Sequence, residues 1–522
     1  MQQKLTYATL SADSDELHVA MDEALERIQS QLGKTYPLWI NGEPRVAEET
    51  FASFTPIDTR EPINHFSFAS TEDVNEAVAA AKAAFPAWAR TPWQDRVAMI
   101  RRIVDVLNER KFDLAAAMIM DTGKNRLEAL GEVGETIDIY SYYADKMEED
   151  AGYVYEMKSE TGRDRNRSVF KPYGVWGIIS PFNFPFALAA APICAAILTG
   201  NTVVIKPGED APWVIVMLTE WFHEIGLPAG VLNTVTGNGR TAGAAIINHP
   251  DTAGMTFTGS YNVGYNIVYK GFAKDYPKPA IIEMGGKNPV IVSDKADIDK
   301  AASGVMRGAF GLGGQKCSAT SRVYVHEAVY DTFMDRLLAM TEEKVTIGDP
   351  RERGTFLGPV INDEAYTKYQ DAIEKARRDG KVVYGGDVVT EGEFAHGYFV
   401  QPAIMTDLGE EHELVRNELF LPILYVNKVT SLDQAMDYAN DTEFGLTAGI
   451  FSEDQTELDW FLDNIEAGVV YANREGGATT GAWPHHQTFG GWKGSGSTGT
   501  NIFGEFSLIS YLREQSQTIY RD

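Results

Sequence analysis

The sequence predicts an α/β protein with parallel sheets, and three observations support this fold class. Apolar strands alternate with helices from residue 169 onward, for example the strands 175–180 and 202–207 on either side of the helix 186–198. The 48 glycines suit many tight turns between strands and helices. A chain of 522 residues is long enough for two or more domains with large cores. Alternation at this length implies parallel strands with helices on both faces.

The segments before residue 169 are expected to be mainly helical. Apolar residues recur at helical spacing in 11–31, 71–85, 94–120 and 128–149. Ser70 and the three residues after it form a capping signal for the second of these helices, and Pro86 is expected just past its end. The dipeptide Asn41-Gly42 predicts the turn of a β-hairpin.

After residue 169 the expected elements are strands with short helices between them. Further strands are expected within 232–237, 254–260 and 281–293, and further helices within 214–226 and 243–248. A second α/β run follows over residues 296–470. The last residues, 513–522, alternate polar and apolar side chains as a terminal strand does, and such a strand must pair with another.

Composition limits the classes of function. The 46 basic and 74 acidic residues give a formal net charge of −28, which repels nucleic acid and anionic lipid. Two cysteines are too few for a disulfide framework or a metal-binding cluster. The most apolar stretch, residues 184–200, contains two prolines and is shorter than a membrane span, and the first residues lack an apolar signal core. We expect a cytoplasmic protein without a metal site.

Cys317 is the candidate nucleophile. It lies in GQKCSATSR between a glycine-rich loop and a strand, and its neighbours Lys316 and Ser318 are not typical of a core. We expect the nearby cation to favour the reactive thiolate. Cys194 has Ala, Ile and Pro neighbours at helical spacing, so it is interpreted as a structural cysteine.

Two further residues have side chains that suit this chemistry. Glu283 closes an apolar strand before a glycine turn, where partial burial would raise its pKa toward that of a general base; the alternative is a surface glutamate at a turn. Asn183 follows a buried strand in the aromatic loop ISPFNFP, where its amide can donate to a developing oxyanion; the alternative is a simple turn residue.

Several segments suit a dinucleotide. Lys206 and Glu209 follow a buried strand, where ligands of open α/β sheets bind. Gly259 and Ser260 follow another, and Ser260 stands where it can open a helix and meet a phosphate. The near-match to a Rossmann fingerprint at 237–243 is weak. A carboxylate at Glu209 can accept ribose hydroxyls and disfavours a 2′-phosphate, so NAD is favoured and NADP stays open.

Seven segments together resemble the aldehyde dehydrogenase superfamily, in its order and spacing: PFNFP, VIKPGE, FTGS, EMGGK, GQKCS, NELFLP and FGGWKGSG. The resemblance implies an aldehyde dehydrogenase-like fold with a Rossmann-type NAD-binding domain in residues 1–152 and 174–285. It also implies an α/β catalytic domain in 286–490 and a small β oligomerisation element in 153–173 and 491–522. A homodimer or a higher homo-oligomer is expected.

The resemblance also implies a role for each motif. The Cys317 thiolate attacks the aldehyde carbonyl, while the Asn183 amide and the Cys317 backbone N–H stabilise the oxyanion. Hydride leaves for the nicotinamide, and Glu283 activates the water that hydrolyses the resulting thioester. The expected cofactor contacts are Lys206, Glu209, Gly259, Ser260, Glu418 and Phe420. Leu421 replaces the Gly that many relatives have, which implies altered packing beside the cofactor.

Within the superfamily, the sequence is most similar to the subfamily that oxidises L-glutamate γ-semialdehyde to glutamate in proline degradation. Ser318 directly after the nucleophile, the run NREGGATTGA at 473–482 and the long N-terminal helix carry this similarity. It implies that Ser318, Phe184 and Gly504 contact the substrate, Gly504 through a backbone loop within 497–506. Residues 500–503 depart from the subfamily's glycine-rich string.

Three alternatives stay open. The first is a dehydrogenase acting on another small aldehyde or semialdehyde, because residues 500–503 differ. The second is a CoA-acylating enzyme, which Glu283 disfavours because that chemistry needs no hydrolytic base. The third is a binding or structural protein on this scaffold that has lost catalytic activity, which the presence of Cys317, Glu283 and Asn183 disfavours.

Overall fold

The computed structural model describes residues 14–274, 276–475 and 483–520. Within them, the N-terminal part forms a seven-stranded sheet in the order β12-β11-β8-β9-β10-β2-β3. Its parallel strands are β8 (Val175–Ile179), β9 (Thr202–Lys206), β10 (Leu232–Thr234), β11 (Thr252–Thr258) and β12 (Ala280–Glu283). Every residue of β8 and β9 is buried, as expected for central strands covered on both faces. The predicted α/β class is confirmed.

Helices cover both faces of this sheet. One face packs against α6 (Ala187–Thr199) and α7 (Trp213–Glu224), and the other against α2 (Thr71–Trp88) and α8 (Ala244–Asn248). Outside the first layer lie α1 (Asp15–Gln29), α3 (Trp93–Glu109), α4 (Lys111–Thr122) and α5 (Arg126–Glu149). The remaining helical pieces of this part are η1 (Gly239–Gly243), η2 (Asn262–Tyr269) and α9 (Lys270–Phe272).

Two helix boundaries differ from the prediction. The single helix expected over 94–120 is wrong, because Arg110, at φ −105° and ψ 14°, separates α3 from α4. Pro86 lies inside α2 and not past its end. We attribute the extra turn to Trp88, which is buried and whose indole N–H donates to the carbonyl of Ile197 at 3.0 Å. This anchoring offsets the backbone hydrogen bond that proline cannot make.

The predicted hairpin is confirmed. Strand β2 (Leu38–Ile40) pairs antiparallel with β3 (Glu43–Arg45) at the edge of the first sheet. Asn41 and Gly42 both have positive φ, 55° and 80°, as a two-residue turn of this kind requires. A separate small sheet contains β1 (Thr35–Tyr36), β5 (Asn64–Ser67) and β4 (Thr50–Ser53).

The second α/β run forms a second seven-stranded sheet in the order β15-β16-β17-β14-β13-β19-β20. Its strands are β13 (Asn288–Val292), β14 (Thr320–His326), β15 (Lys381–Tyr384), β16 (Ala403–Thr406), β17 (Ile423–Val429), β19 (Thr447–Phe451) and β20 (Val469–Ala472). Its helices are α10 (Ile298–Phe310), α11 (Tyr330–Lys344), α12 (Asp363–Asp379), α13 (Glu413–Arg416), α14 (Leu432–Asn440) and α15 (Gln455–Asn464). Short pieces complete it: η3 (Gly311–Gly314), η4 (Gly392–Phe394), β18 (Phe444–Gly445) and β21 (Trp492–Lys493).

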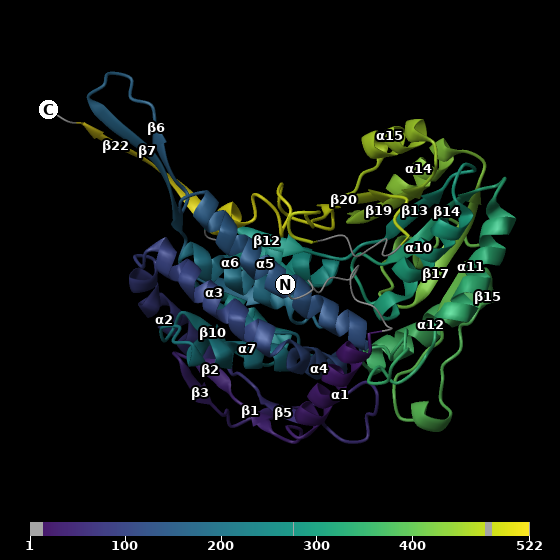
Figure 1. Cartoon of the computed structure of the whole chain (residues 1–522), viewed down its shortest axis with the longest axis horizontal. Helices are drawn as coiled ribbons and strands as arrows, with labels where there is room; N and C mark the ends of the chain where they lie inside the picture. The colour runs from purple at the N-terminus through teal and green to yellow at the C-terminus, as the bar shows by residue number, and fades with distance from the viewer. Residues whose placement is uncertain (1–13, 275, 476–482, 521–522) are drawn as a thin grey trace.

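A three-stranded arm projects from the body of the molecule (Figure 1). It contains β6 (Val154–Met157), β7 (Asp164–Pro172) and β22 (Leu512–Tyr520), which follows the short η5 (Leu508–Tyr511). Each residue of β22 pairs antiparallel with one of β7, so the predicted terminal strand has a partner. In the described ranges 14–274, 276–475 and 483–520, no helix is long and apolar enough to cross a membrane.

A buried arginine ties the second sheet together. Arg322 on β14 is 2% exposed, and its guanidinium donates to the carbonyls of Lys287, Tyr438 and Ala439 at 2.7 to 3.0 Å. It thereby joins β14 to the residue before β13 and to the end of α14. Because a guanidinium has five donors in a fixed fork, no other side chain satisfies this set of carbonyls.

Replacement of Arg322 by methionine should therefore lower the free energy of unfolding by about 3 kcal/mol, because three buried carbonyls lose their donor. Urea denaturation followed by tryptophan fluorescence measures the change. The matched control is Arg378→Met, which removes an exposed ion pair with Asp379 and should change stability by less than about 1 kcal/mol. Equal effects of the two substitutions would contradict this account.

Candidate active site

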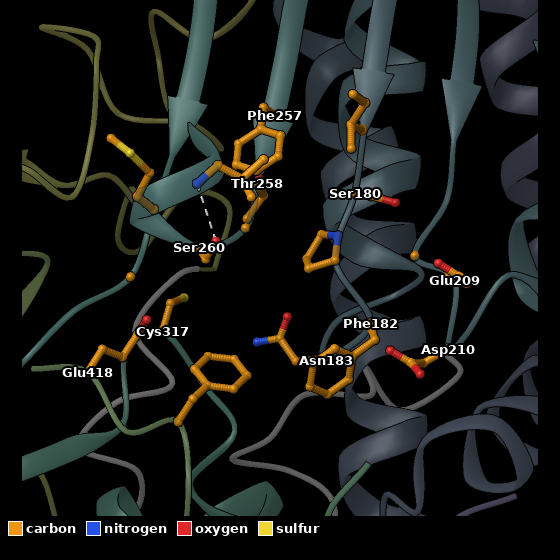
Figure 2. Close-up of a pocket in the computed structure, with 18 of the residues that line it drawn as sticks. Ser180, Phe182, Asn183, Glu209, Asp210, Phe257, Thr258, Ser260, Cys317 and Glu418 are labelled. Atoms are coloured by element: carbon orange, nitrogen blue, oxygen red, sulfur yellow. Dashed lines mark hydrogen bonds between the residues drawn. The ribbon is translucent and has the colours of Figure 1, made fainter. Parts of the chain in front are cut away.

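A cavity of about 410 Å³ opens at the carboxyl ends of the parallel strands of the first sheet. Its walls come from the residues after β8, β9, β11 and β12, and from the second α/β unit (Figure 2). This is where ligands of open parallel sheets bind. Of the predicted site residues, the cavity brings together Asn183, Lys206, Glu209, Gly259, Ser260, Cys317, Glu418 and Phe420.

Cys317 lies in a tight turn between η3 and β14. The N–H of Ala319 donates to the carbonyl of Lys316 at 3.0 Å and closes this turn. Asn183, 3% exposed, faces the same cavity, and Figure 2 shows its amide nitrogen pointing to the side on which Cys317 lies. The ring of Phe182 meets that of Phe420 edge-on at 5.9 Å, which closes the cavity floor beside Asn183.

The expected cation effect on the thiol is wrong. The ammonium of Lys316 lies 3.4 Å from the carboxylate of Glu128, so its charge is already paired. Burial, together with the nearby carboxyls of Glu418 and Glu283, raises the pKa of the Cys317 thiol to about 12, although the backbone N–H groups of Ser318 and Cys317 oppose this rise. In this structure the thiol is therefore neutral at physiological pH, and backbone dipoles are what favour its ionisation.

Glu283 ends β12 and is 4% exposed, which excludes a surface glutamate. Burial raises the pKa of its carboxyl to about 8, and the N–H of Gly491 donates to Oε2 at 3.1 Å. The side chain lines a separate cavity of about 20 Å³, together with the hydroxyl-bearing residues Tyr143, Ser507 and Tyr511. A space of this size holds one water molecule. The carboxyl thus faces away from the larger cavity, although it is close enough to raise the pKa of Cys317.

The predicted cofactor residues after β9 and β11 differ in their surroundings. Lys206 donates through Nζ to the carbonyls of Pro207 and Gly237 at 2.7 and 2.9 Å, and burial lowers its pKa to about 8. Glu209 is exposed at the cavity edge. Ser260 lies just before η2, and its hydroxyl accepts from the N–H of Val263 in the first turn of that helix at 3.4 Å. Ser260 therefore opens a helix, as predicted.

Residues of the second α/β unit close the other side. Glu418 accepts from the N–H of Gly286 at 3.0 Å, and burial raises the pKa of its carboxyl to about 7. Phe420 has φ +60°, which is uncommon for a bulky residue. Such strained backbone conformations are frequent at functional sites. Leu421 is buried in the core of the second sheet and does not line the cavity. The altered packing that was expected beside the cofactor is therefore not seen.

Lys368 is one of the cavity residues that the sequence did not indicate as part of a site. Lys368 of α12 lines the cavity and donates through Nζ to the carbonyl of Leu419 at 2.6 Å. Burial lowers its pKa, and Glu418 opposes this change. No local signal marks Lys368, because its helix is amphipathic and polar like many surface helices. Its proximity to Glu418 arises only from the tertiary fold.

The predicted substrate residues lie outside the lining of the large cavity. Ser318 is 5% exposed, next to the nucleophile, and Phe184 packs beneath the ammonium of Lys124 at 4.0 Å from its ring centre. The N–H of Gly504 donates to the hydroxyl of Ser507 at 2.7 Å. The expected backbone anchor is therefore already bonded within the protein in this structure, which contradicts a free N–H at Gly504. The residues Thr480, Gly481 and Ala482 lie outside the described residues.

Comparison with known proteins is consistent with this geometry. A family model described as the aldehyde dehydrogenase family matches residues 40–516. The chain is 37% identical to 1-pyrroline-5-carboxylate dehydrogenase of Geobacillus sp. (strain WCH70), covering 95% of each chain, and 38% identical to 1-pyrroline-5-carboxylate dehydrogenase 2 of Bacillus subtilis (strain 168), covering 92% of each. A crystal structure of the Thermus 1-pyrroline-5-carboxylate dehydrogenase with bound NAD has a TM-score of 0.92, 34% identity and 97% coverage of both chains. The chain therefore belongs to the aldehyde dehydrogenase family.

Proposed function

We propose that the protein oxidises L-glutamate 5-semialdehyde to L-glutamate with NAD, the second step of proline degradation. The observation that carries this proposal is the cavity in which the half-buried thiol of Cys317 and the buried amide of Asn183 meet a side lined by Glu209 and Glu418, which suits a cofactor. The names of the relatives at 37% and 38% identity support the choice of substrate.

The first half of the reaction rests on Cys317 and Asn183. The Cys317 thiol first loses its proton to solvent, and the thiolate sulfur then forms a bond to the aldehyde carbon. The carbonyl π bond breaks, and its electron pair makes the oxygen an oxyanion in the thiohemiacetal. The amide of Asn183 and the N–H of Cys317 donate to that oxygen. Donors of this kind, held in place before the charge develops, contribute about 3 kcal/mol each to the transition state.

The cavity fits a dinucleotide. Its volume of about 410 Å³ and its position at the strand ends suit such a ligand, and a Cβ at Gly208 would lie 2.9 Å from the backbone of Pro181, so glycine keeps two walls close together. Lys206, Glu209, Gly259 and Ser260 would hold the adenosine half, and Glu418, Phe420 and Lys368 the nicotinamide half. When bound, NAD supplies the acceptor for the hydride that leaves the substrate. The exposed carboxylate of Glu209 favours ribose hydroxyls over a 2′-phosphate.

The second half rests on Glu283. After oxidation, Cys317 carries a thioester, and Glu283 takes a proton from the water that hydrolyses it. A pKa of about 8 is close to the working pH, where a general base is most effective. The carboxyl must turn from Gly491 toward the sulfur for this step. The two glycines after Met284 permit that movement, because they leave the strand end free of side chains.

A second candidate function is oxidation of a different small aldehyde. The bonds at 500–504 favour it: the N–H groups of Ile502 and Gly504 donate to Phe489 and Ser507 within the protein at 2.7 Å each. A substrate carboxylate must displace such a bond or meet another donor. Ser318, directly after the nucleophile, is the donor that the subfamily resemblance offers instead.

We also propose a homo-oligomer. The arm of β6, β7 and β22 is too thin to bury a core of its own, yet it exposes five large apolar side chains, Val154, Tyr155, Met157, Ile519 and Tyr520. A second copy of the chain is the partner that would cover them. The net charge of −28 fits a cytoplasmic protein that binds neither nucleic acid nor anionic membranes.

Steady-state kinetics tests the proposed substrate. We expect kcat/KM for glutamate semialdehyde to exceed that for succinic semialdehyde and propanal by tenfold or more, because contacts to a charged head group contribute about 1.5–3 kcal/mol. NAD should be preferred over NADP. Ser318→Ala should lower kcat/KM for glutamate semialdehyde and leave that for propanal nearly unchanged. Equal values for all three aldehydes would favour the second candidate.

The pH profile tests Glu283. The base acts only when ionised, so hydrolysis should increase as pH rises through about 8 and level off above it. Glu283→Gln should lower kcat by a hundredfold or more and limit NADH production to one rapid turnover per site. That first turnover should keep its own pH dependence, since it reports the thiol. A Glu283→Gln variant that turns over continuously at the wild-type rate would rule out this role.

A further inference from the structure

Two buried side chains hold the turn that carries Cys317. The amide of Asn288 donates through Nδ2 to the carbonyls of Cys317 and Ala319 at 2.7 and 2.8 Å. The hydroxyl of Thr447 donates to the carbonyl between them, that of Ser318, at 3.2 Å. Three consecutive carbonyls are thus fixed by two side chains, which are 3% and 2% exposed.

The positions of Asn288 and Thr447 explain how both reach the turn. They are the first residues of the adjacent parallel strands β13 and β19. Strand β14, which follows the cysteine turn, is the other neighbour of β13, with Thr320 opposite Asn288. The N–H of Thr447 also donates to Oδ1 of Asn288 at 3.0 Å, so the amide is fixed in orientation with its nitrogen toward the turn.

The hydrogen bonds to the carbonyls determine where the N–H groups point. In a trans peptide, C=O and N–H point in opposite directions. A Cys317 carbonyl directed at Asn288 therefore turns the N–H of Ser318 the other way, and this N–H lowers the pKa of the Cys317 thiol. A Ser318 carbonyl directed at Thr447 likewise turns the N–H of Ala319 toward the carbonyl of Lys316, which it meets at 3.0 Å.

We propose that Asn288 and Thr447 are positioning residues for the nucleophile: by holding the carbonyls of residues 317–319 they keep the Ser318 N–H aimed at the sulfur. The orientation matters because the two nearby carboxyls oppose ionisation of the thiol. Glu283 from β12 and Glu418 from the loop before β17 both raise its pKa, Asn183 is neutral, and Lys316 is paired with Glu128. Backbone N–H groups are thus the donors that stabilise the thiolate.

The inference deepens the role proposed for Cys317, and its test needs neither aldehyde nor cofactor. Alkylation of Cys317 by iodoacetamide, followed across pH, reports the apparent pKa and reactivity of the thiol. Cys317→Ala corrects for Cys194, which is fully buried. If glutamate semialdehyde is not the substrate, the alkylation measurement is unaffected. If Asn288 and Thr447 do not position the thiol, the substrate kinetics still test the proposed function.

The decisive pair is Thr447→Val and Thr447→Ser. Valine keeps the shape and removes the donor, whereas serine keeps the donor. We expect Thr447→Val to slow alkylation at pH 8 by about five- to tenfold and to raise the apparent thiol pKa, as loss of one buried hydrogen bond would. Thr447→Ser should stay within about twofold of the wild type. Asn288→Ala, where it folds, should show a larger effect than Thr447→Val.

The matched control is Thr341→Val in α11, which removes a buried hydroxyl that donates to the carbonyl of Leu337 at 2.7 Å, away from the site. It should leave the alkylation profile unchanged. In Thr447→Val, kcat should fall while the Kd for NAD stays constant. A folded Thr447→Val protein with a lower Tm but a wild-type alkylation profile and kcat would overturn the proposal. The proposal would also be overturned if Thr447→Ser slowed alkylation as much as Thr447→Val.

Discussion

The close approach of the turn at Gly285–Gly286 to the cysteine turn is the constraint on which the site depends. A Cβ at Gly286 would lie 2.6 Å from the carbonyl oxygen of Cys317, and one at Gly285 would lie 2.1 Å from the carboxylate of Glu418. Side chains at either position would push the two α/β units apart. The glycine pair thus allows Glu283, at the end of one sheet, and Cys317, at the start of a strand of the other, to share one site.

The carboxyls of Glu283 and Glu418 and the thiol of Cys317 lie close together at this junction, so the charge on each carboxyl affects ionisation of the thiol. Burial raises the pKa of the carboxyls of Glu283 and Glu418 to about 8 and about 7. At neutral pH each is partly protonated, and a protonated carboxyl does not oppose formation of the Cys317 thiolate. The proposed mechanism needs Glu283 ionised only while water is activated, and the neutral form of Glu283 is compatible with formation of the thiolate. A carboxyl pKa of about 8 leaves both forms present near neutral pH.

Much of the fold could be predicted because its signals are local. The Asn41-Gly42 turn, the fully apolar strands at 175–179 and 202–206 and the capping signal at Ser70 each depend on adjacent residues. The helix through Pro86 could not be predicted, because buried Trp88 contacts a distant helix. The break at Arg110 also had no signal in the periodicity.

The same distinction applies to the site. Eight of the predicted site residues share one cavity, whereas Glu283 lines a smaller cavity beside it. What the sequence could not show are the partners of side chains that meet across the fold. Examples are the pairing of Lys316 with Glu128 and the position of Lys368 beside Glu418. Asn288 belongs here too, since its two acceptors come from another strand's turn.

The central claim is that the oxidised substrate is carried by Cys317 and released by Glu283. The most direct measurement is the intact mass of the Glu283→Gln protein, rapidly quenched after mixing with glutamate semialdehyde and NAD, followed by peptide mapping. The account predicts one acyl group per chain, located on the peptide that contains Cys317 and absent when NAD is left out. A protein that stays unmodified while producing NADH, or an acyl group on Cys194, would contradict it.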